Sequence, residues 1–160
     1  MKDESLIFEL KTPVKGAHFL IVKSAYRKAV IDRLVDGVIA TLKEYGVTFE
    51  TIDVHGSLEI PAAIALAEDS DEDFDGYIAL GCILKGETIH DEVIAYTAYQ
   101  ALQDMSVNRN LAIGCGILTV NTEAQAIERA DPAQQNRGRE AALAALQMLG
   151  IRQKYGVSVK

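Results

Sequence analysis

The sequence contains few cysteines and histidines, the residues that form disulfides and most zinc sites. Its 160 residues include two cysteines and three histidines. Cys82 and Cys115 are too far apart in the chain for a zinc-type pair, and the histidines at positions 18, 55 and 90 show no metal-ligand spacing. Both cysteines lie in apolar segments, so we expect them to be reduced residues of the core. The sequence therefore predicts no metal site.

The sequence also has no excess of positive charge and no long apolar run. The formal net charge is -7, whereas binding to a nucleic acid or to an anionic membrane surface requires clustered Lys and Arg. No apolar run reaches the ~18 residues that a membrane span needs. The segment MKDESLIFELK at the start lacks the basic and apolar regions of a signal peptide. We therefore expect no nucleic-acid or membrane partner, and a location in the cytoplasm.

Segments with the apolar pattern of strands alternate along the chain with segments that have the apolar pattern of helices. The length and the 49% hydrophobic content are those of one ordinary domain, so we treat residues 1–160 as a single domain. Short β-rich segments lie at 17–23, 47–54, 75–84 and 111–120. Helical segments follow at about 24–45, 61–67, from 88 onward, 122–130 and from 136 onward. This alternation predicts an α/β fold of three layers, flavodoxin-like, in which a four-stranded parallel sheet has helices on both faces.

Two segments do not belong to this alternation. The acidic run EDSDEDFDG at 68–76 resembles the start of a calcium loop. However, Phe74 stands where that loop needs glycine and Leu80 where it needs glutamate, so we expect a solvated loop. The segment SLIFEL at 5–10 is strand-like, and we expect residues 1–15 to form an edge strand or an arm that pairs with another chain.

Polar residues gather where the predicted strands end. In an open parallel sheet, ligands bind beyond the carboxyl ends of the strands. The segments that follow the four strands are KSAYRK, HGSLEIP, LKGETIH and LTVNTE. In LKGETIH, Gly86 permits a tight turn and Thr88 is placed to cap the next helix, so the N–H groups around Glu87 and Thr88 form a small anion site. The alternative is an ordinary capped helix start, because no Walker-type loop is present.

Three ionisable residues lie at the same edge, each with a simpler alternative. His90 falls in the first turn of the predicted helix, where the dipole favours a neutral imidazole that accepts a proton; the alternative is a surface or capping histidine. For Glu59 the alternative is favourable charge at a helix N-terminus, and for Arg129 a cation at a helix C-terminus. These three residues lie at the same edge of the sheet as the anion turn. This arrangement favours a small phosphorylated substrate that reacts by acid–base chemistry.

Five blocks of the sequence together resemble the lumazine synthase family, from about residue 18 to the last helix. The blocks are HFLIVKSAYRK, VHGSLEIPAA, ALGCILKGETIHDEV, GILTVNTEAQAIERA and NRGREAA. The resemblance implies a transferase of riboflavin biosynthesis, 6,7-dimethyl-8-ribityllumazine synthase, that condenses 5-amino-6-(D-ribitylamino)uracil with 3,4-dihydroxy-2-butanone 4-phosphate. It also implies a homopentamer whose active sites lie between neighbouring subunits, and no metal or organic cofactor.

The resemblance assigns roles to particular residues, with His90 as the proton-transfer group. The pocket for the pyrimidine ring and the ribityl chain is implied at Tyr26, Ser57, Leu58, Glu59, Gly81, Cys82 and Ile83, with Cys115 contributed by the adjacent subunit. The phosphate site is implied at Gly86, Glu87 and Thr88, with Arg129 from the adjacent subunit and Arg137 where the family usually has lysine.

The sequence leaves other functions and assemblies open. Arg27 stands where asparagine is common in the family, Asp91 where an aromatic residue is usual and Cys115 where a larger apolar residue often packs. The last two changes motivate an alternative, a paralogue that binds flavin or lumazine with weak or no turnover. A structural role is a third hypothesis, since some relatives close twelve pentamers into an icosahedral 60-mer. A decamer is also open, although the connector ADPAQQNRG with Pro132 favours a pentamer.

Overall fold

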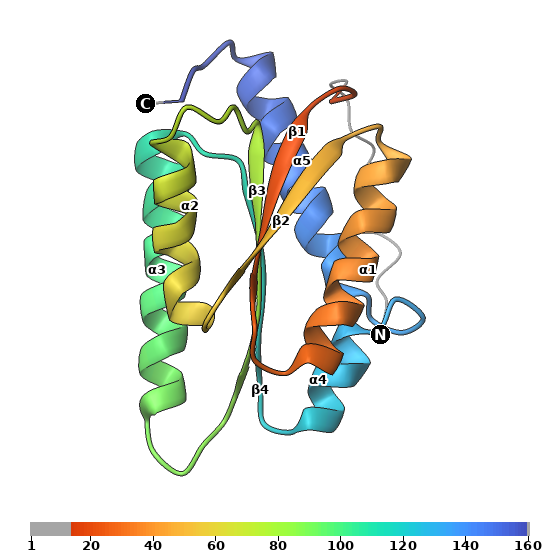
Figure 1. Ribbon diagram of the computed structural model, residues 1–160, viewed down its shortest axis with the longest axis vertical. Helices are drawn as coiled ribbons and strands as arrows, with labels where there is room; N and C mark the ends of the chain where they lie inside the picture. The colour runs from red at the N-terminus through yellow and green to blue at the C-terminus, as the bar shows by residue number, and fades with distance from the viewer. Residues whose placement is uncertain (1–13, 160) are drawn as a thin grey trace.

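The computed structural model describes residues 14–159 and contains a four-stranded parallel sheet between two layers of helices (Figure 1). The strands are β1 (His18–Ser24), β2 (Thr48–Val54), β3 (Gly76–Leu84) and β4 (Ile113–Val120), in the order β2-β1-β3-β4. β1 pairs with β2 in register from His18 against Thr48 to Ser24 against Val54. The predicted α/β class is confirmed, and each predicted strand matches an observed one closely.

The helices cover both faces of the sheet. α1 (Lys28–Glu44), α4 (Glu123–Ala130) and α5 (Arg137–Lys154) lie on one face, and α2 (Ile60–Glu68) and α3 (His90–Arg109) lie on the other (Figure 1). A short 3-10 turn, Ser57–Glu59, leads into α2. The Thr122 hydroxyl accepts a hydrogen bond from the Gln125 amide at 3.2 Å, so the predicted cap of α4 is confirmed.

Alternate strand residues contribute to two apolar cores, one on each face of the sheet. Phe19 and Ile21 of β1 pack in the core that contains Leu34 of α1 and Leu146 of α5. Leu20 and Val22 belong instead to the core beneath α2 and α3. Because β1 and β3 are inner strands covered on both faces, they are buried along most of their length, as the nearly continuous apolar runs predicted.

The first helix begins later than predicted, at Lys28 rather than near Ser24. Arg27 has a left-handed backbone, with φ 57° and ψ 56°, which a right-handed helix cannot include. The amide of Ala25 donates to the carbonyl of Val54 at 2.8 Å and ties this segment to the end of β2. Residues 25–27 therefore form a loop at the carboxyl edge of the sheet.

The expectation that both cysteines are core residues is wrong for Cys115. Cys82 lies on an inner strand and is buried, whereas Cys115 is exposed. β4 is an edge strand, and its apolar sequence does not ensure that both faces are covered: Cys115 and Thr119 both lie on its exposed positions. The two thiols are free.

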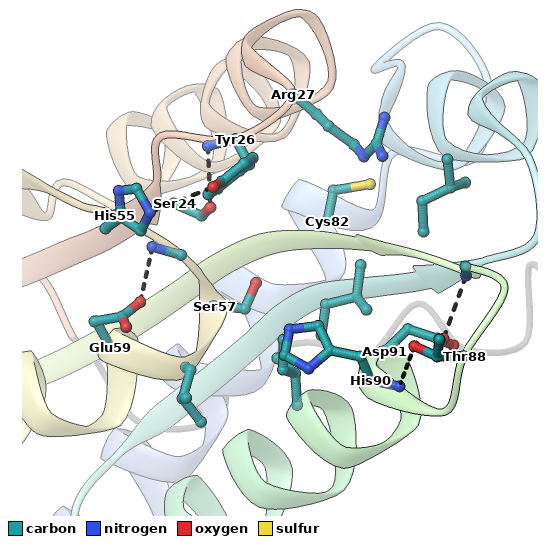
Figure 2. Close-up of a pocket in the computed structure, with 16 residues that line it drawn as sticks. Ser24, Tyr26, Arg27, His55, Ser57, Glu59, Cys82, Thr88, His90 and Asp91 are labelled. Atoms are coloured by element: carbon teal, nitrogen blue, oxygen red, sulfur yellow. Dashed lines mark hydrogen bonds between the residues drawn. The ribbon is translucent and has the colours of Figure 1, made fainter.

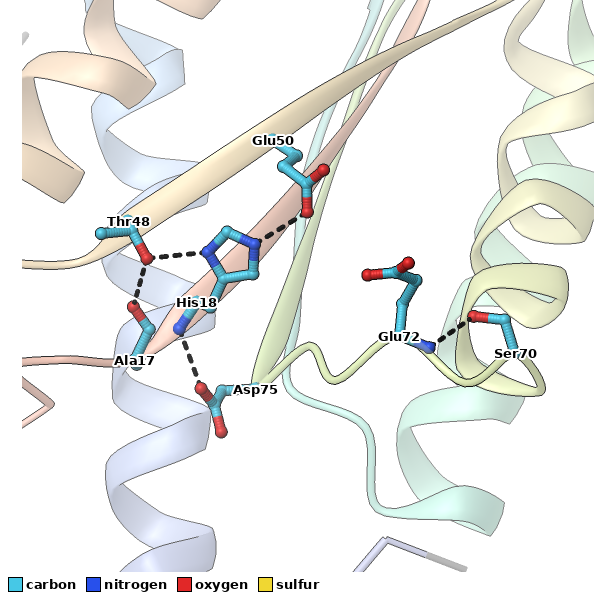
Figure 3. Close-up of polar contacts among 7 residues, drawn as sticks. All are labelled: Ala17, His18, Thr48, Glu50, Ser70, Glu72 and Asp75. Carbon is cyan, nitrogen blue, oxygen red and sulfur yellow. Dashed lines mark hydrogen bonds and ion pairs between the residues drawn. The ribbon is translucent and has the colours of Figure 1, made fainter.

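A polar cluster lies at the amino ends of the strands, opposite the predicted site (Figure 3). The His18 ring bridges two residues of β2, with Nδ1 2.7 Å from Thr48 Oγ1 and Nε2 2.8 Å from Glu50 Oε2. The His18 backbone N–H donates to the Asp75 carboxylate at 2.8 Å. These contacts hold the edge strand β2 and the loop before β3 to the start of β1.

The remaining sequence features concern loops and the N-terminal segment. The run at 68–76 extends from the last residue of α2 to the first of β3, and the loop between them is largely exposed, with Asp69 paired to Arg109 at 2.6 Å. Among residues 14–159, no group of three or more His, Cys, Asp and Glu side chains is placed to hold a metal ion. No helix in that range is long and apolar enough to cross a membrane. The strand-like segment 5–10 lies outside the described part of the chain.

Candidate active site

The segments that follow β1, β2 and β3 border a cavity of about 510 Å³ (Figure 2). Cavities of this size suit a small organic ligand, and the position beyond the carboxyl ends of parallel strands is the one expected for this fold. The predicted site residues that line it are Tyr26, Ser57, Leu58, Glu59, Cys82, Ile83, Gly86, Thr88 and His90. One chain therefore brings together residues from three separate loops.

The loop after β1 places an aromatic ring at the mouth of the cavity. Tyr26 is exposed, and its backbone N–H donates to the Ser24 hydroxyl at 3.2 Å. The Tyr26 ring meets the His55 ring edge-on, with centroids 5.2 Å apart and planes at 80°. The Tyr26 hydroxyl lies 3.3 Å from His55 Nε2. One face of a polarisable ring is thus available to a flat heterocycle.

The loop after β2 is held by its own polar groups. The Glu59 carboxylate accepts a hydrogen bond from the Gly56 amide at 2.8 Å, which fixes the turn before α2. Ser57 is buried and packs against Gly81 of β3, where an added Cβ would lie 2.4 Å from Ser57 Oγ. Gly81 therefore sits behind Ser57 and does not line the cavity, although glycine is needed there for the close approach.

The floor of the cavity contains Cys82 as a neutral thiol. Burial raises the pKa of the Cys82 thiol, and the nearby Arg27 guanidinium opposes this rise only in part. Figure 2 shows Arg27 on the wall above Cys82. Because a raised pKa keeps the thiol protonated at neutral pH, Cys82 is not suited to act as a nucleophile.

The turn after β3 joins the cavity to the start of α3. The helix begins at His90, two residues after the predicted start near Thr88, and Ile89 is its N-cap residue, so the prediction that Thr88 caps the helix is wrong. The Thr88 hydroxyl still accepts a hydrogen bond from the His90 amide at 3.3 Å, and the Gly86 amide donates to Asp91 Oδ1 at 3.3 Å. The Thr88 and Asp91 side chains thus each satisfy one amide where the turn meets the helix.

His90 is exposed at the first position of α3, and Figure 2 shows its ring on the cavity side of the helix. Glu87 is exposed on the turn but does not line the cavity. The arrangement therefore combines a titratable ring, a turn with backbone donors and a hydroxyl along one wall.

Three predicted site residues lie elsewhere. Cys115, Arg129 and Arg137 line a different cavity, of about 430 Å³, between β4 and the last two helices. Arg129 Nη1 donates to the Gln125 carbonyl at 3.3 Å, and Arg137 pairs with Glu140. The single chain does not bring this second set together with Tyr26 and His90.

Seven residues that line the first cavity were not predicted to be site residues, and three of them have ionisable side chains. Arg27, His55 and Asp91 line it alongside the predicted ones. His55 is the first residue after β2 and Asp91 follows His90. Their positions at a strand end and a helix start could therefore have predicted that they line the cavity. The orientation of Arg27 depends on its left-handed backbone, which its sequence neighbours do not indicate.

The fold and the cavity define a three-layer α/β protein with a cavity of small-molecule size beyond its strand ends. The family model described as 6,7-dimethyl-8-ribityllumazine synthase matches residues 16–153. A protein of that name from Bartonella tribocorum is 44% identical over 147 residues, which cover 92% of this chain and 97% of the relative. The chain therefore belongs to the 6,7-dimethyl-8-ribityllumazine synthase family.

Other relatives agree with this assignment. The 6,7-dimethyl-8-ribityllumazine synthase 1 of Rhodopseudomonas palustris is 46% identical over 148 residues, covering 90% of this chain and 91% of the relative. The 6,7-dimethyl-8-ribityllumazine synthase of Novosphingobium aromaticivorans is 48% identical over 139 residues, covering 87% and 99%. The similarity thus extends over nearly the whole of each protein.

Proposed function

We propose that this chain is a 6,7-dimethyl-8-ribityllumazine synthase, a transferase that condenses 5-amino-6-(D-ribitylamino)uracil with 3,4-dihydroxy-2-butanone 4-phosphate. The observation that carries the proposal is the cavity of about 510 Å³, in which Tyr26, the Gly86–Thr88 turn and His90 meet. The family membership of the chain supports the same reaction. No resident metal or organic cofactor takes part in this proposal.

The pyrimidine substrate is assigned to the side of the cavity that contains Tyr26. The aromatic face stacks on the heterocycle, and the segment Ser57–Glu59 with the end of β3, including Cys82 and Ile83, contacts the ring and the ribityl chain. The exposed ring of Tyr26 and the hydrogen-bonded loop that precedes α2 support this placement.

The phosphorylated ketone is assigned to the other side. The Gly86, Glu87 and Thr88 turn holds its phosphate, because backbone donors at a helix start favour an anion. The substrate amine attacks the ketone and a Schiff base forms with loss of water, phosphate leaves by elimination, and ring closure releases a second water. His90 lies beside this turn and transfers protons during these steps.

The remaining residues are assigned to the neighbouring subunit of a homopentamer. Cys115 of one subunit packs against the pyrimidine bound to the next, and Arg129 and Arg137 approach its phosphate. Two observations support this: these residues line a different cavity from His90, and the outer face of α3 exposes Ile89, Val93 and Tyr96, the last of them 77% exposed. A decamer and an icosahedral 60-mer are the alternative assemblies. The cytoplasm is the proposed location.

A direct assay tests the proposal. Purified protein is mixed with both substrates, and the absorbance and fluorescence of the lumazine are followed above the reaction without enzyme. We expect a clear acceleration, and we expect His90→Ala to lower it by about 10²-fold, the low end of general acid–base contributions. Binding of the pyrimidine without any acceleration would instead identify a binding paralogue.

A further inference from the structure

We propose that Asp91 is an internal competitor for the phosphate turn and thereby lowers the affinity of the site for its phosphorylated substrate. The inference rests on the proposed function, because it concerns the same turn. It starts from one contact: the Gly86 amide, a donor assigned to the substrate phosphate, is bonded to Asp91 Oδ1 at 3.3 Å.

The contact runs back from the helix to the end of the strand. Asp91 is the second residue of α3, and Gly86 lies at the beginning of the turn that precedes the helix. The side chain of Asp91 lies beside those of Thr88 and His90 (Figure 2). A carboxylate of the protein itself therefore lies where an incoming anion is to be bound.

A phosphate and this carboxylate exclude one another at the Gly86 amide. The N–H donates well to one acceptor, and two anions within hydrogen-bonding distance of the same donor repel each other. The bond of 3.3 Å is long for an N–H···O contact, and Gly86 is exposed. A stronger acceptor such as phosphate can therefore replace Asp91 at this amide. Phosphate binding thus requires that Asp91 leave the amide.

A neighbouring cavity can accept the Asp91 carboxylate when phosphate displaces it. Asp91 lines the first cavity and also a neighbouring one of about 480 Å³, which Lys85 and Glu92 line as well. Lys85 attracts a displaced carboxylate, whereas Glu92 repels it. Arg27 and Glu59 are the other formally charged residues of the first cavity. We therefore expect Asp91 to move from Gly86 toward Lys85 when phosphate binds, and its position at Gly86 is the one that competes with substrate.

Glu92 provides the matched control for an experiment on Asp91. Both carboxylates lie in the first turn of α3, so replacing either one removes the same charge near the same helix start. Only Asp91 bonds the Gly86 amide. The difference between Asp91→Asn and Glu92→Gln therefore isolates competition at the amide from a general loss of negative charge.

Titration of the full-length oligomer with inorganic phosphate, followed by calorimetry, measures the effect without turnover. We expect Asp91→Asn to bind phosphate about fivefold more tightly than the unchanged protein, because the neutral amide oxygen of Asn is a weaker acceptor than the carboxylate and does not repel phosphate. Glu92→Gln is expected to change the affinity by less than about twofold, because exposed charges are screened. In the assay, Asp91→Asn is expected to lower the KM for the butanone phosphate and leave the KM for the pyrimidine unchanged.

Several results would overturn the inference. Equal tightening in both variants would indicate a charge effect only, and weaker or unchanged binding by Asp91→Asn would indicate that the carboxylate merely stabilises the turn. Absence of phosphate binding in every protein would also refute it. If Asp91→Asn does not fold, Asp91→Ser serves in the same comparison. A lack of lumazine formation by the unchanged protein would refute the proposed function, while the phosphate titration would still decide the role of Asp91.

Discussion

Gly114 shows how one missing side chain sets the distance between a strand and a helix. A Cβ at this position of β4 would lie 1.9 Å from the carbonyl oxygen of Ala141 in α5 and 3.1 Å from the Ala145 side chain. The obstacle is mainly backbone, which cannot rotate away as a long side chain does. Glycine therefore lets α5 lie directly against the sheet, close to the residues that the proposal assigns to the subunit boundary.

Gly114→Ala is expected to lower the free energy of unfolding by about 3 kcal/mol, at the upper end of the usual range for overpacking. Urea denaturation followed by circular dichroism measures the change. Gly86→Ala is the control, because the nearest atom to its added Cβ is Asp91 Oδ1 at 3.9 Å, and we expect a change within about 0.5 kcal/mol. Equal effects of the two substitutions would show that the approach of α5 is not constrained at Gly114.

At the scale of the elements, one ion pair links α1 to α5. Arg139 donates from Nη1 to Glu44 Oε2 at 2.6 Å and from Nη2 to Oε1 at 3.4 Å. The hydrogen bond from Arg139 lowers the pKa of the Glu44 carboxyl below its usual value. Because the folded pKa is below the unfolded one, the pair stabilises the fold at neutral pH, and this contribution is lost as the pH falls through the folded pKa.

Glu44→Gln is therefore expected to destabilise the protein at pH 7 by less than about 1 kcal/mol, since the pair is largely exposed. The difference from the unchanged protein is expected to disappear in acid, below the lowered pKa of Glu44. Thermal unfolding at a series of pH values measures both effects. Glu72→Gln is the control: Glu72 is exposed, and its carboxylate forms no ion pair with any of residues 14–159, so we expect no change. A difference that persists in acid would contradict the assignment to Glu44 ionisation.

At the scale of the whole molecule, the division of the predicted residues between two cavities has a measurable consequence. His90 and Arg129 line different cavities of one chain, and the proposal brings them together across a subunit boundary. Chains that lack one of them should then complement chains that lack the other.

Co-refolding of equal amounts of the His90→Ala and Arg129→Ala chains tests this directly. In a closed ring with random order, about a quarter of the sites receive both intact residues from neighbouring chains, because each site uses one face of two subunits. We expect the mixture to regain about that share of the activity, measured at low butanone phosphate, while each variant alone stays near the background. A mixture that shows only the mean of the two variants would place both residues in the same subunit's site.

The sequence predicts most of this architecture, because apolar runs and helix caps are local. The strands match to within a residue or two, and the cap at Thr122 is where its spacing places it. The start of α1 was missed because the hydrogen bond from Ala25 to Val54 comes from a distant strand. Cys115 was misplaced because burial on β4 depends on which helix covers an edge strand, which periodicity does not reveal.

The sequence predicts the residues of the site less completely than it predicts the fold. Glu59 and His90 were predicted because the topology brings strand and helix ends to one edge, whereas Tyr26 was predicted from the family resemblance; all three line the cavity. The contact between Gly86 and Asp91 was not, since it depends on how a short loop satisfies its own amides. The roles of these residues in binding and proton transfer stay predictions until the assay is done.

The strand order also affects how fast the chain folds and which strand is exposed during folding. Every pair in the sheet is parallel, and β1 pairs with both β2 and β3. Parallel neighbours cannot be joined by a tight hairpin, so each pairing closes a long segment of chain before its contacts form. During synthesis on the ribosome, the apolar β1 has a free edge until β3 has emerged. We therefore expect slower folding than that of a helical bundle of the same length, with β1 as the segment most exposed to aggregation in the interval.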